Sequence, residues 1–102
     1  MARIFEWDKA KAASNIKKHS VTFNTASRVF LDKDHLSELE SHVGNEERWQ
    51  TTGQVDVALY VVVIHTDWED NGDEIIRIIS ARRATPRERK KYEQGKFGSL
   101  RH

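Results

Sequence analysis

The spacing of apolar residues divides the chain into a helical first third and a strand-rich remainder. Apolar and polar residues alternate over 4–7, which predicts a short strand. Asp8 is suited to cap a helix over 9–18, and Thr22 to cap a second helix whose apolar residues recur at helical spacing. The acidic segment 32–46 shows neither the alternation of a strand nor the apolar spacing of a helix, and we interpret it as a loop.

From residue 48 onward the apolar period changes from 3.6 to 2, which is typical of strands. The uninterrupted apolar run 61–64 indicates a central strand covered on both faces. Asn71-Gly72 is a hairpin signal, although the acidic residues around it favour a loop longer than two residues. The predicted strands are 48–52, 57–66 and 75–81.

The last predicted helix has the clearest start signal. Thr85, Pro86 and Glu88 have the spacing of a capping box with proline at the first helical position. We expect this helix to end near Gly95 and residues 96–102 to form a flexible tail. The sequence therefore predicts an α+β fold in a single domain over 1–95, with two N-terminal helices, an antiparallel sheet of about three to four strands and a C-terminal helix.

Composition excludes several kinds of protein. The chain of 102 residues contains no cysteine, which removes disulfides, thiolate metal sites and thiol nucleophiles. Its longest apolar run, 57–64, is far shorter than the ~20 residues of a membrane helix. Charged residues interrupt the N-terminus, so we expect no signal peptide and a cytoplasmic protein without membrane contact.

The formal net charge of +1 conceals a strong segregation of charge along the chain. Residues 51–76 contain six acidic and no basic side chains, whereas residues 77–102 contain nine basic and two acidic ones. Such a distribution favours a partner of one sign. The basic end of the chain therefore indicates an anionic partner such as RNA.

Arginines concentrate where the last strand meets the last helix. Arg82 and Arg83 directly precede the predicted helix N-terminus, and two guanidinium groups beside free N–H groups suit a phosphate. Arg77 interrupts an apolar strand, and a stem packed on the rim of the core explains it equally well. For the basic residues of the last helix, a charged face that only contacts solvent is an equal alternative to RNA binding. The candidates for RNA contact are Arg48, Arg87, Lys90, Lys91 and Tyr92.

Two titratable residues could perform acid–base chemistry next to these arginines. His19 stands at the predicted end of the first helix and Glu47 at the start of a strand. Metal-free RNA cleavage needs a base for the 2′-hydroxyl, cations for the phosphorane and an acid for the leaving oxygen. Each residue also has a simpler interpretation, His19 as a partner of the helix dipole and Glu47 as a surface ion pair.

A metal site is not expected. The segment 67–72 has the oxygen donors of the start of a calcium loop, but Ile78 occupies the position that requires a bidentate carboxylate. We also find no phosphate-binding glycine loop. No cofactor is predicted.

Several segments together resemble the BrnT family of type II toxins, which are small ribonucleases with a RelE-like fold. The resemblance extends over about residues 4–93. It departs from the family at Ser20, where glycine is usual, and in an acidic insertion over 68–74 that is longer than usual. The segments that carry it are Phe5-Glu6-Trp7-Asp8 with Lys11 and Asn15, Lys18-His19-Ser20-Val21, Glu47-Arg48-Trp49, Val61-Val62-Val63, Arg77-Ile78-Ile79-Ser80-Ala81-Arg82-Arg83-Ala84 and Tyr92-Glu93.

The resemblance implies an endoribonuclease that cuts messenger RNA and slows growth. It also implies a BrnA-like ribbon-helix-helix antitoxin that blocks the toxin, with DNA contacted only through the antitoxin. The implied site positions are His19, Glu47, Arg48, Arg77, Arg82, Arg83 and Tyr92. The residues leave two alternatives open: a non-catalytic module that binds RNA or protein through the basic face, and a protein that works mainly within an antitoxin complex on DNA.

Overall fold

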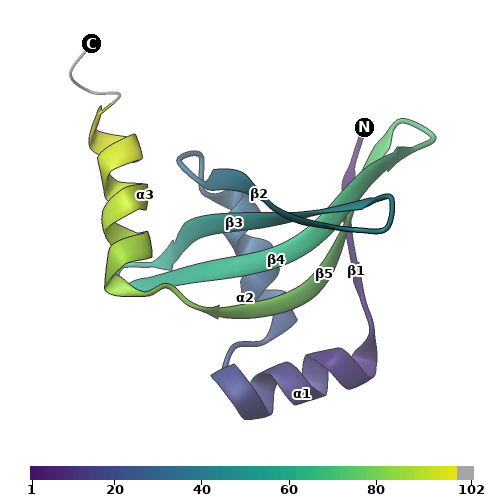
Figure 1. Ribbon diagram of the computed structural model, residues 1–102, viewed down its shortest axis with the longest axis horizontal. Coiled ribbons are helices and arrows are strands. Elements are labelled where there is room, and N and C mark those ends of the chain that lie inside the picture. The colour runs from purple at the N-terminus through teal and green to yellow at the C-terminus, as the bar shows by residue number, and fades with distance from the viewer. Residues whose placement is uncertain (99–102) are drawn as a thin grey trace.

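The computed structural model describes residues 1–98, which form one curved five-stranded sheet with helices on one face and at its ends (Figure 1). The strands lie in the order β1-β5-β4-β3-β2. None of the helices in this part of the chain is long and apolar enough to cross a membrane. The elements are β1 (Arg3–Trp7), α1 (Lys9–His19), α2 (Phe23–Ser27), the 3₁₀ helix η1 (Arg28–Leu31), β2 (Leu36–Val43), β3 (Glu46–Asp56), β4 (Leu59–Asp70), β5 (Asp73–Arg83) and α3 (Pro86–Gly98).

The predicted α+β class is confirmed, but the sheet differs from the prediction in two ways. It has five strands, and β1 pairs with β5 in parallel while the other pairs are antiparallel. The extra strand is β2, which occupies the acidic segment 32–46 that we interpreted as a loop. An edge strand has one pairing partner and little buried surface, so its sequence needs no strict alternation of apolar residues.

The turn between β4 and β5 is shorter than predicted. Asn71 and Gly72 have φ values of 52° and 85°, and Asp70 pairs directly with Asp73, so the loop has two residues. Two left-handed residues match the twist of a hairpin, which explains the Asn-Gly pair. The acidic residues that favoured a longer loop are paired across the hairpin, where solvent screens their repulsion.

The predicted helix starts are confirmed. Asp8 accepts a hydrogen bond from the Lys11 amide (3.0 Å), and Thr85 and Glu88 form the reciprocal bonds of a capping box. Helix α3 continues past Gly95 to Gly98, so residues 96–98 are helical, and the rest of the predicted tail lies outside the described residues. Ser20 ends α1 in the left-handed region (φ 57°), the conformation that glycine adopts without strain.

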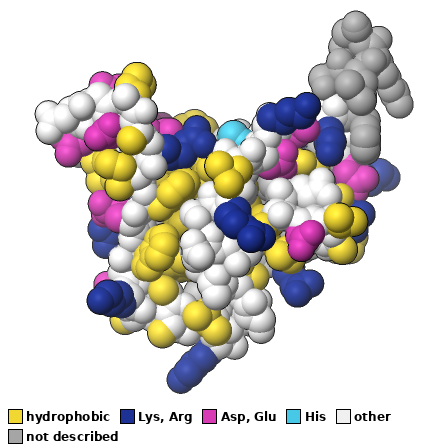
Figure 2. All heavy atoms as spheres, turned by 180° about the vertical axis from the view of Figure 1, so that it is seen from behind, with side chains coloured by type: hydrophobic (Ala, Val, Ile, Leu, Met, Phe, Trp, Pro, Cys, Tyr) yellow, Lys and Arg dark blue, Asp and Glu magenta, His cyan; other side chains and the backbone are white. Residues whose placement is uncertain are grey.

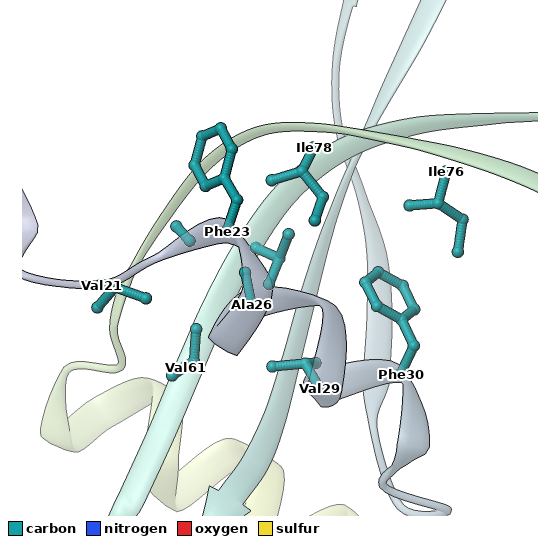
Figure 3. Close-up of a cluster of buried hydrophobic side chains, with 10 residues drawn as sticks. Val21, Phe23, Ala26, Val29, Phe30, Val61, Ile76 and Ile78 are labelled. Carbon is teal, nitrogen blue, oxygen red and sulfur yellow. The ribbon is translucent and has the colours of Figure 1, made fainter. Parts of the chain in front are cut away.

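The core lies between the sheet and the two short helices α2 and η1 (Figure 3). Phe23, Ala26 and Val29 pack against alternate residues of β4 and β5, such as Val61 and Ile76. The side chains between these project from the other side of the sheet. We call this side the open face; its residues are Arg48, Gln50 and Thr52 of β3, Val62, Ile64 and Thr66 of β4, and Arg77, Ser80 and Arg82 of β5.

Gly53 allows η1 to pack directly on the sheet, and we expect Gly53→Ala to destabilise the fold. A Cβ there would lie 2.7 Å from Cγ1 of the buried Val29 and 3.1 Å from its carbonyl oxygen. We expect a loss of about 1–3 kcal/mol in the free energy of unfolding, measured by urea denaturation. Gly95→Ala is the matched control, because its Cβ meets nothing within 4 Å. It should stabilise helix α3 by about 0.5–1 kcal/mol, and equal effects of the two variants would contradict this prediction.

Candidate active site

Helix α1 is anchored to β5 by a single buried side chain, Asn15. Its Nδ2 donates to the carbonyl oxygens of Ala81 (2.8 Å) and Val21 (2.9 Å), and its Oδ1 accepts from the Ala81 amide (3.0 Å). Strand β1 pairs with β5 only as far as Ile78, so the edge of β5 at Ala81 is free for this contact. The amide of Asn15 therefore takes the place that a neighbouring strand would have.

His19 lies on the same face of helix α1 as Asn15 and therefore beside β5. Side chains three and four positions apart share a helix face, so Lys18 and His19 lie on the side of Asn15. With Ile79 and Ser80 of β5 they border a shallow depression of about 180 Å³. We call this depression the α1–β5 seam; it is lined by Lys11, Ser14, Asn15, Lys18, His19, Ile79 and Ser80.

The cations at the seam form no ion pair with a carboxylate in the described part of the chain. Among the described residues, neither Lys11 nor Lys18 forms an ion pair, and the same holds for Arg83 at the end of β5. Arg83 is exposed and follows Ala81 by two residues, so it projects from the same face of the sheet. Unpaired cations around a histidine produce a positive site for an anion.

Arg82, by contrast, is occupied. Its two terminal nitrogens donate to the two carboxylate oxygens of Glu88, at 2.7 and 2.9 Å. This bidentate bond, helped by the Thr85 amide, lowers the pKa of Glu88 to about 2. The predicted role of Arg82 as a free phosphate ligand is therefore not what the structure shows, because its guanidinium fixes the start of α3 to the open face.

The Arg82–Glu88 pair should make stability depend on pH in the acidic range. Because the folded pKa of Glu88 lies below its ordinary 4.5, the stabilisation is complete above that value and is lost as the pH falls towards 2. Glu88 is one-fifth and Arg82 over one-third exposed, so solvent screening leaves about 1–2 kcal/mol. Chemical denaturation of wild type and Glu88→Gln at pH 6 and pH 3 measures this contribution. The difference in the free energy of unfolding between the two proteins should be smaller at pH 3, and an unchanged difference would contradict the assignment.

The remaining predicted site residues are Arg77, predicted to stabilise the scissile phosphate, and the RNA-contact candidates Arg48, Arg87, Lys90 and Lys91. Arg77 donates to Glu6 (2.8 Å) and Arg48 lies 3.6 Å from Glu46. Arg87 and Lys91 of α3 border a hollow of about 370 Å³ between α3 and strands β2 and β3, where Lys91 pairs with Glu38. Lys90 is exposed on α3 outside that hollow.

Glu47 does not join His19, which corrects the predicted acid–base pair. It lies beside His42 (3.6 Å) in the hairpin of β2 and β3. Across the sheet, the β3 residue level with Arg82 is Thr52. Glu47 lies five residues further along β3, roughly 17 Å from that level, so it is far from the part of β5 that helix α1 contacts. Side-chain alternation also turns Glu47 away from the open face, because its neighbour Arg48 projects from it.

Tyr92 is a core residue and not a surface for stacking bases. It is 1% exposed, its hydroxyl donates to Asp32 (2.5 Å), and its ring contacts Tyr60 edge-on. Burial and the bond to Asp32 raise the pKa of the Tyr92 hydroxyl. The residue fixes α3 to the segment after η1. Tyr60 carries the guanidinium of Arg89 over its ring, 4.2 Å from the centroid.

Sequence reasoning missed Lys11, Lys18 and Ser80 as parts of a site. Lys11, Asn15 and Lys18 stand at i, i+4 and i+7, a spacing that places them on one helix face and could have indicated it. Charge alone does not locate the site. From behind, Lys and Arg side chains are spread over the surface, while acidic ones gather on the projecting β4–β5 hairpin (Figure 2). Within the described residues, no group of three or more His, Asp or Glu side chains is placed to hold a metal ion.

Comparison with known proteins identifies the family. The profile of the family described as ribonuclease toxin, BrnT, of type II toxin–antitoxin systems matches residues 7–88. The chain has the fold of the Brucella abortus ribonuclease toxin BrnT, with a TM-score of 0.57 and 22% identity over 83% of this chain and 99% of that one. No curated protein sequence matches it. Because the profile covers most of the chain, the protein belongs to the BrnT family of ribonuclease toxins of type II toxin–antitoxin systems.

Proposed function

We propose that the protein is an endoribonuclease that cleaves messenger RNA without a metal ion, with the α1–β5 seam as its active site. The observation that carries this proposal is the grouping of His19 with Lys11 and Lys18 in the depression beside β5; Arg83 stands further along the same strand. Membership of a ribonuclease family supports the substrate class. The residues of the seam supply what the chemistry needs.

Cleavage begins when the 2′-hydroxyl of one nucleotide attacks the adjacent phosphorus. His19 accepts the hydroxyl proton, since histidine is the side chain that exchanges protons near neutral pH. Arg83 and Lys18 stabilise the additional negative charge on the phosphorane oxygens. The bond from phosphorus to the 5′-oxygen then breaks, the leaving oxygen takes a proton from solvent, and a 2′,3′-cyclic phosphate remains.

We further propose that this activity inhibits growth in the cytoplasm and is blocked by a BrnA-like ribbon-helix-helix antitoxin. Family membership implies an antitoxin partner. In this arrangement the antitoxin reads DNA, and the toxin chain reaches DNA only through it. Expression of the chain alone should arrest growth and co-expression of the neighbouring gene should relieve it; growth unaffected by abundant, folded protein would contradict the toxin role.

Replacing Arg83 tests the site. We expect Arg83→Gln to lower kcat/KM for RNA cleavage about 10- to 100-fold, because a charge-assisted contact to phosphate contributes about 1.5–3 kcal/mol. The assay uses purified protein, single-stranded RNA and excess EDTA. Arg28→Gln is the matched control, since Arg28 belongs to η1, away from the seam, and forms no ion pair among the described residues.

The outcomes of this assay separate the proposals. Loss of wild-type cleavage in EDTA contradicts the metal-free mechanism, and equal rates for the two variants contradict the assignment of the seam. RNA that is bound with a salt slope of about −0.7 per phosphate but stays intact identifies the non-catalytic binding module instead.

A further inference from the structure

Two buried polar atoms on the open face have no hydrogen-bond partner in the described part of the chain. They are Oγ1 of Thr66 and Nε of Arg48. Thr66 is only 4% exposed. A buried hydroxyl without a partner costs about 1–3 kcal/mol, so native structures rarely keep one without a reason.

These two atoms belong to one row across the sheet. Thr66 of β4 pairs with Arg77 of β5. On the other side of β4, the last β3–β4 pair is Trp49 with His65, and one step further along these antiparallel strands stand Arg48 and Thr66. His65 contacts Phe30 in the core, so the next residues, Arg48 and Thr66, both project from the open face. Thr66 therefore has an arginine residue beside it on each neighbouring strand, with the strands about 4.8 Å apart.

Among the described residues, both guanidinium groups retain donors without a hydrogen-bond partner. Arg77 makes one side-chain hydrogen bond there, from Nη1 to Glu6, and its side chain is 44% exposed. Arg48 approaches Glu46 at 3.6 Å, which is too long for a hydrogen bond, and its side chain is 31% exposed. Two partly exposed arginines on the strands beside a hydroxyl donor are residue types suited to bind a phosphate group.

The row lies close to the seam. Ser80, which lines the seam, pairs with Ile64, two residues before Thr66 on β4. Two strand residues correspond to about 7 Å, and both side chains belong to the open face. A strand of RNA leaving the seam across the open face would therefore meet Thr66 and its two arginines next.

We propose that Arg48, Thr66 and Arg77 form a phosphate-binding subsite that holds the RNA backbone beside the cleaved bond. The inference rests on the proposed ribonuclease function and extends it, because it assigns a backbone contact outside the seam. A phosphate oxygen accepts from the Thr66 hydroxyl and from the free donors of Arg48 and Arg77. The subsite positions RNA and takes no part in proton transfer.

Thr66→Val is the decisive variant, because it removes the hydroxyl and keeps the shape of the side chain. If the hydroxyl had only a structural role, its removal would leave RNA binding unchanged. We expect the affinity for a short single-stranded RNA with 2′-O-methyl groups, which cannot be cleaved, to fall about 5- to 10-fold in fluorescence anisotropy. Thermal unfolding should show equal or higher stability, since the unpartnered hydroxyl is gone.

Arg48→Gln supplies an independent measurement. It should weaken binding and reduce the slope of log affinity against log salt by about 0.7, one phosphate contact. Arg28→Gln, on the opposite face of the sheet, should change neither quantity. A dinucleotide that fills only the seam should bind Thr66→Val and wild type equally.

Results for binding and cleavage remain separable. Wild-type affinity in folded Thr66→Val or Arg48→Gln would overturn the subsite even if the enzyme cleaves RNA. Absence of RNA binding by the wild type would overturn it as well. Weakened binding in both variants without any wild-type cleavage would support the subsite and contradict the proposed catalytic function.

Discussion

We expect His19→Gln to lower kcat for RNA cleavage by about 10²–10³-fold and to change KM only a few-fold. Positioned acid–base groups contribute about 10²–10⁴-fold to rate, and among the described residues His19 is the only histidine that lines the seam. The side chain is exposed at the end of α1, so its replacement should leave the free energy of unfolding almost unchanged. The measurement is a steady-state titration with single-stranded RNA in excess EDTA.

The pH profile gives a second readout of the same residue. Wild-type kcat should fall with decreasing pH, because a protonated imidazole cannot accept the 2′-hydroxyl proton. His19→Gln should lack this dependence. His42→Gln is the matched control, a half-exposed histidine at the far end of the sheet. The role of His19 would be refuted if kcat of His19→Gln still fell at low pH, or if His19→Gln and His42→Gln had equal effects.

We expect Asn15→Ala to destabilise the protein by about 3–5 kcal/mol. The variant removes three buried hydrogen bonds and leaves the backbone groups of Val21 and Ala81 without partners. Each unsatisfied buried group costs about 1–3 kcal/mol. Urea denaturation measures the loss as a lower midpoint.

Asn24→Ala is the matched control for Asn15→Ala. Asn24 is exposed on α2, and its side chain makes no hydrogen bond within the described residues. We expect it to change stability by less than about 0.5 kcal/mol. Similar losses in the two variants would show that α1 does not depend on the Asn15 anchor. Asn15→Ala should also lose activity, because His19 is held beside β5 by helix α1, which Asn15 anchors.

The parts of the fold that could be predicted are those set by neighbouring residues. The caps at Asp8 and Thr85, and the hairpin at Asn71-Gly72, follow from local backbone geometry and were recognisable in the sequence. Strand β2 was not, because an exposed edge strand is stabilised by pairing with β3 and not by its own pattern. The parallel pairing of β1 with β5 joins residues about seventy positions apart, and a short alternating segment does not specify its partner.

The candidate site shows the same division. The sequence identifies a basic C-terminal region, a histidine suited to proton transfer and the resemblance to BrnT toxins, because these depend on residue types and their spacing. Which charges are free depends on distances between remote residues. Glu88 binds Arg82, Asp32 holds Tyr92 in the core, and Glu47 lies at the far end of β3, whereas Lys18 and Arg83 form no ion pair within residues 1–98. Tertiary contacts assign these partners, since the strength of a charge–charge interaction depends on separation and burial, and neither quantity is encoded locally in the chain.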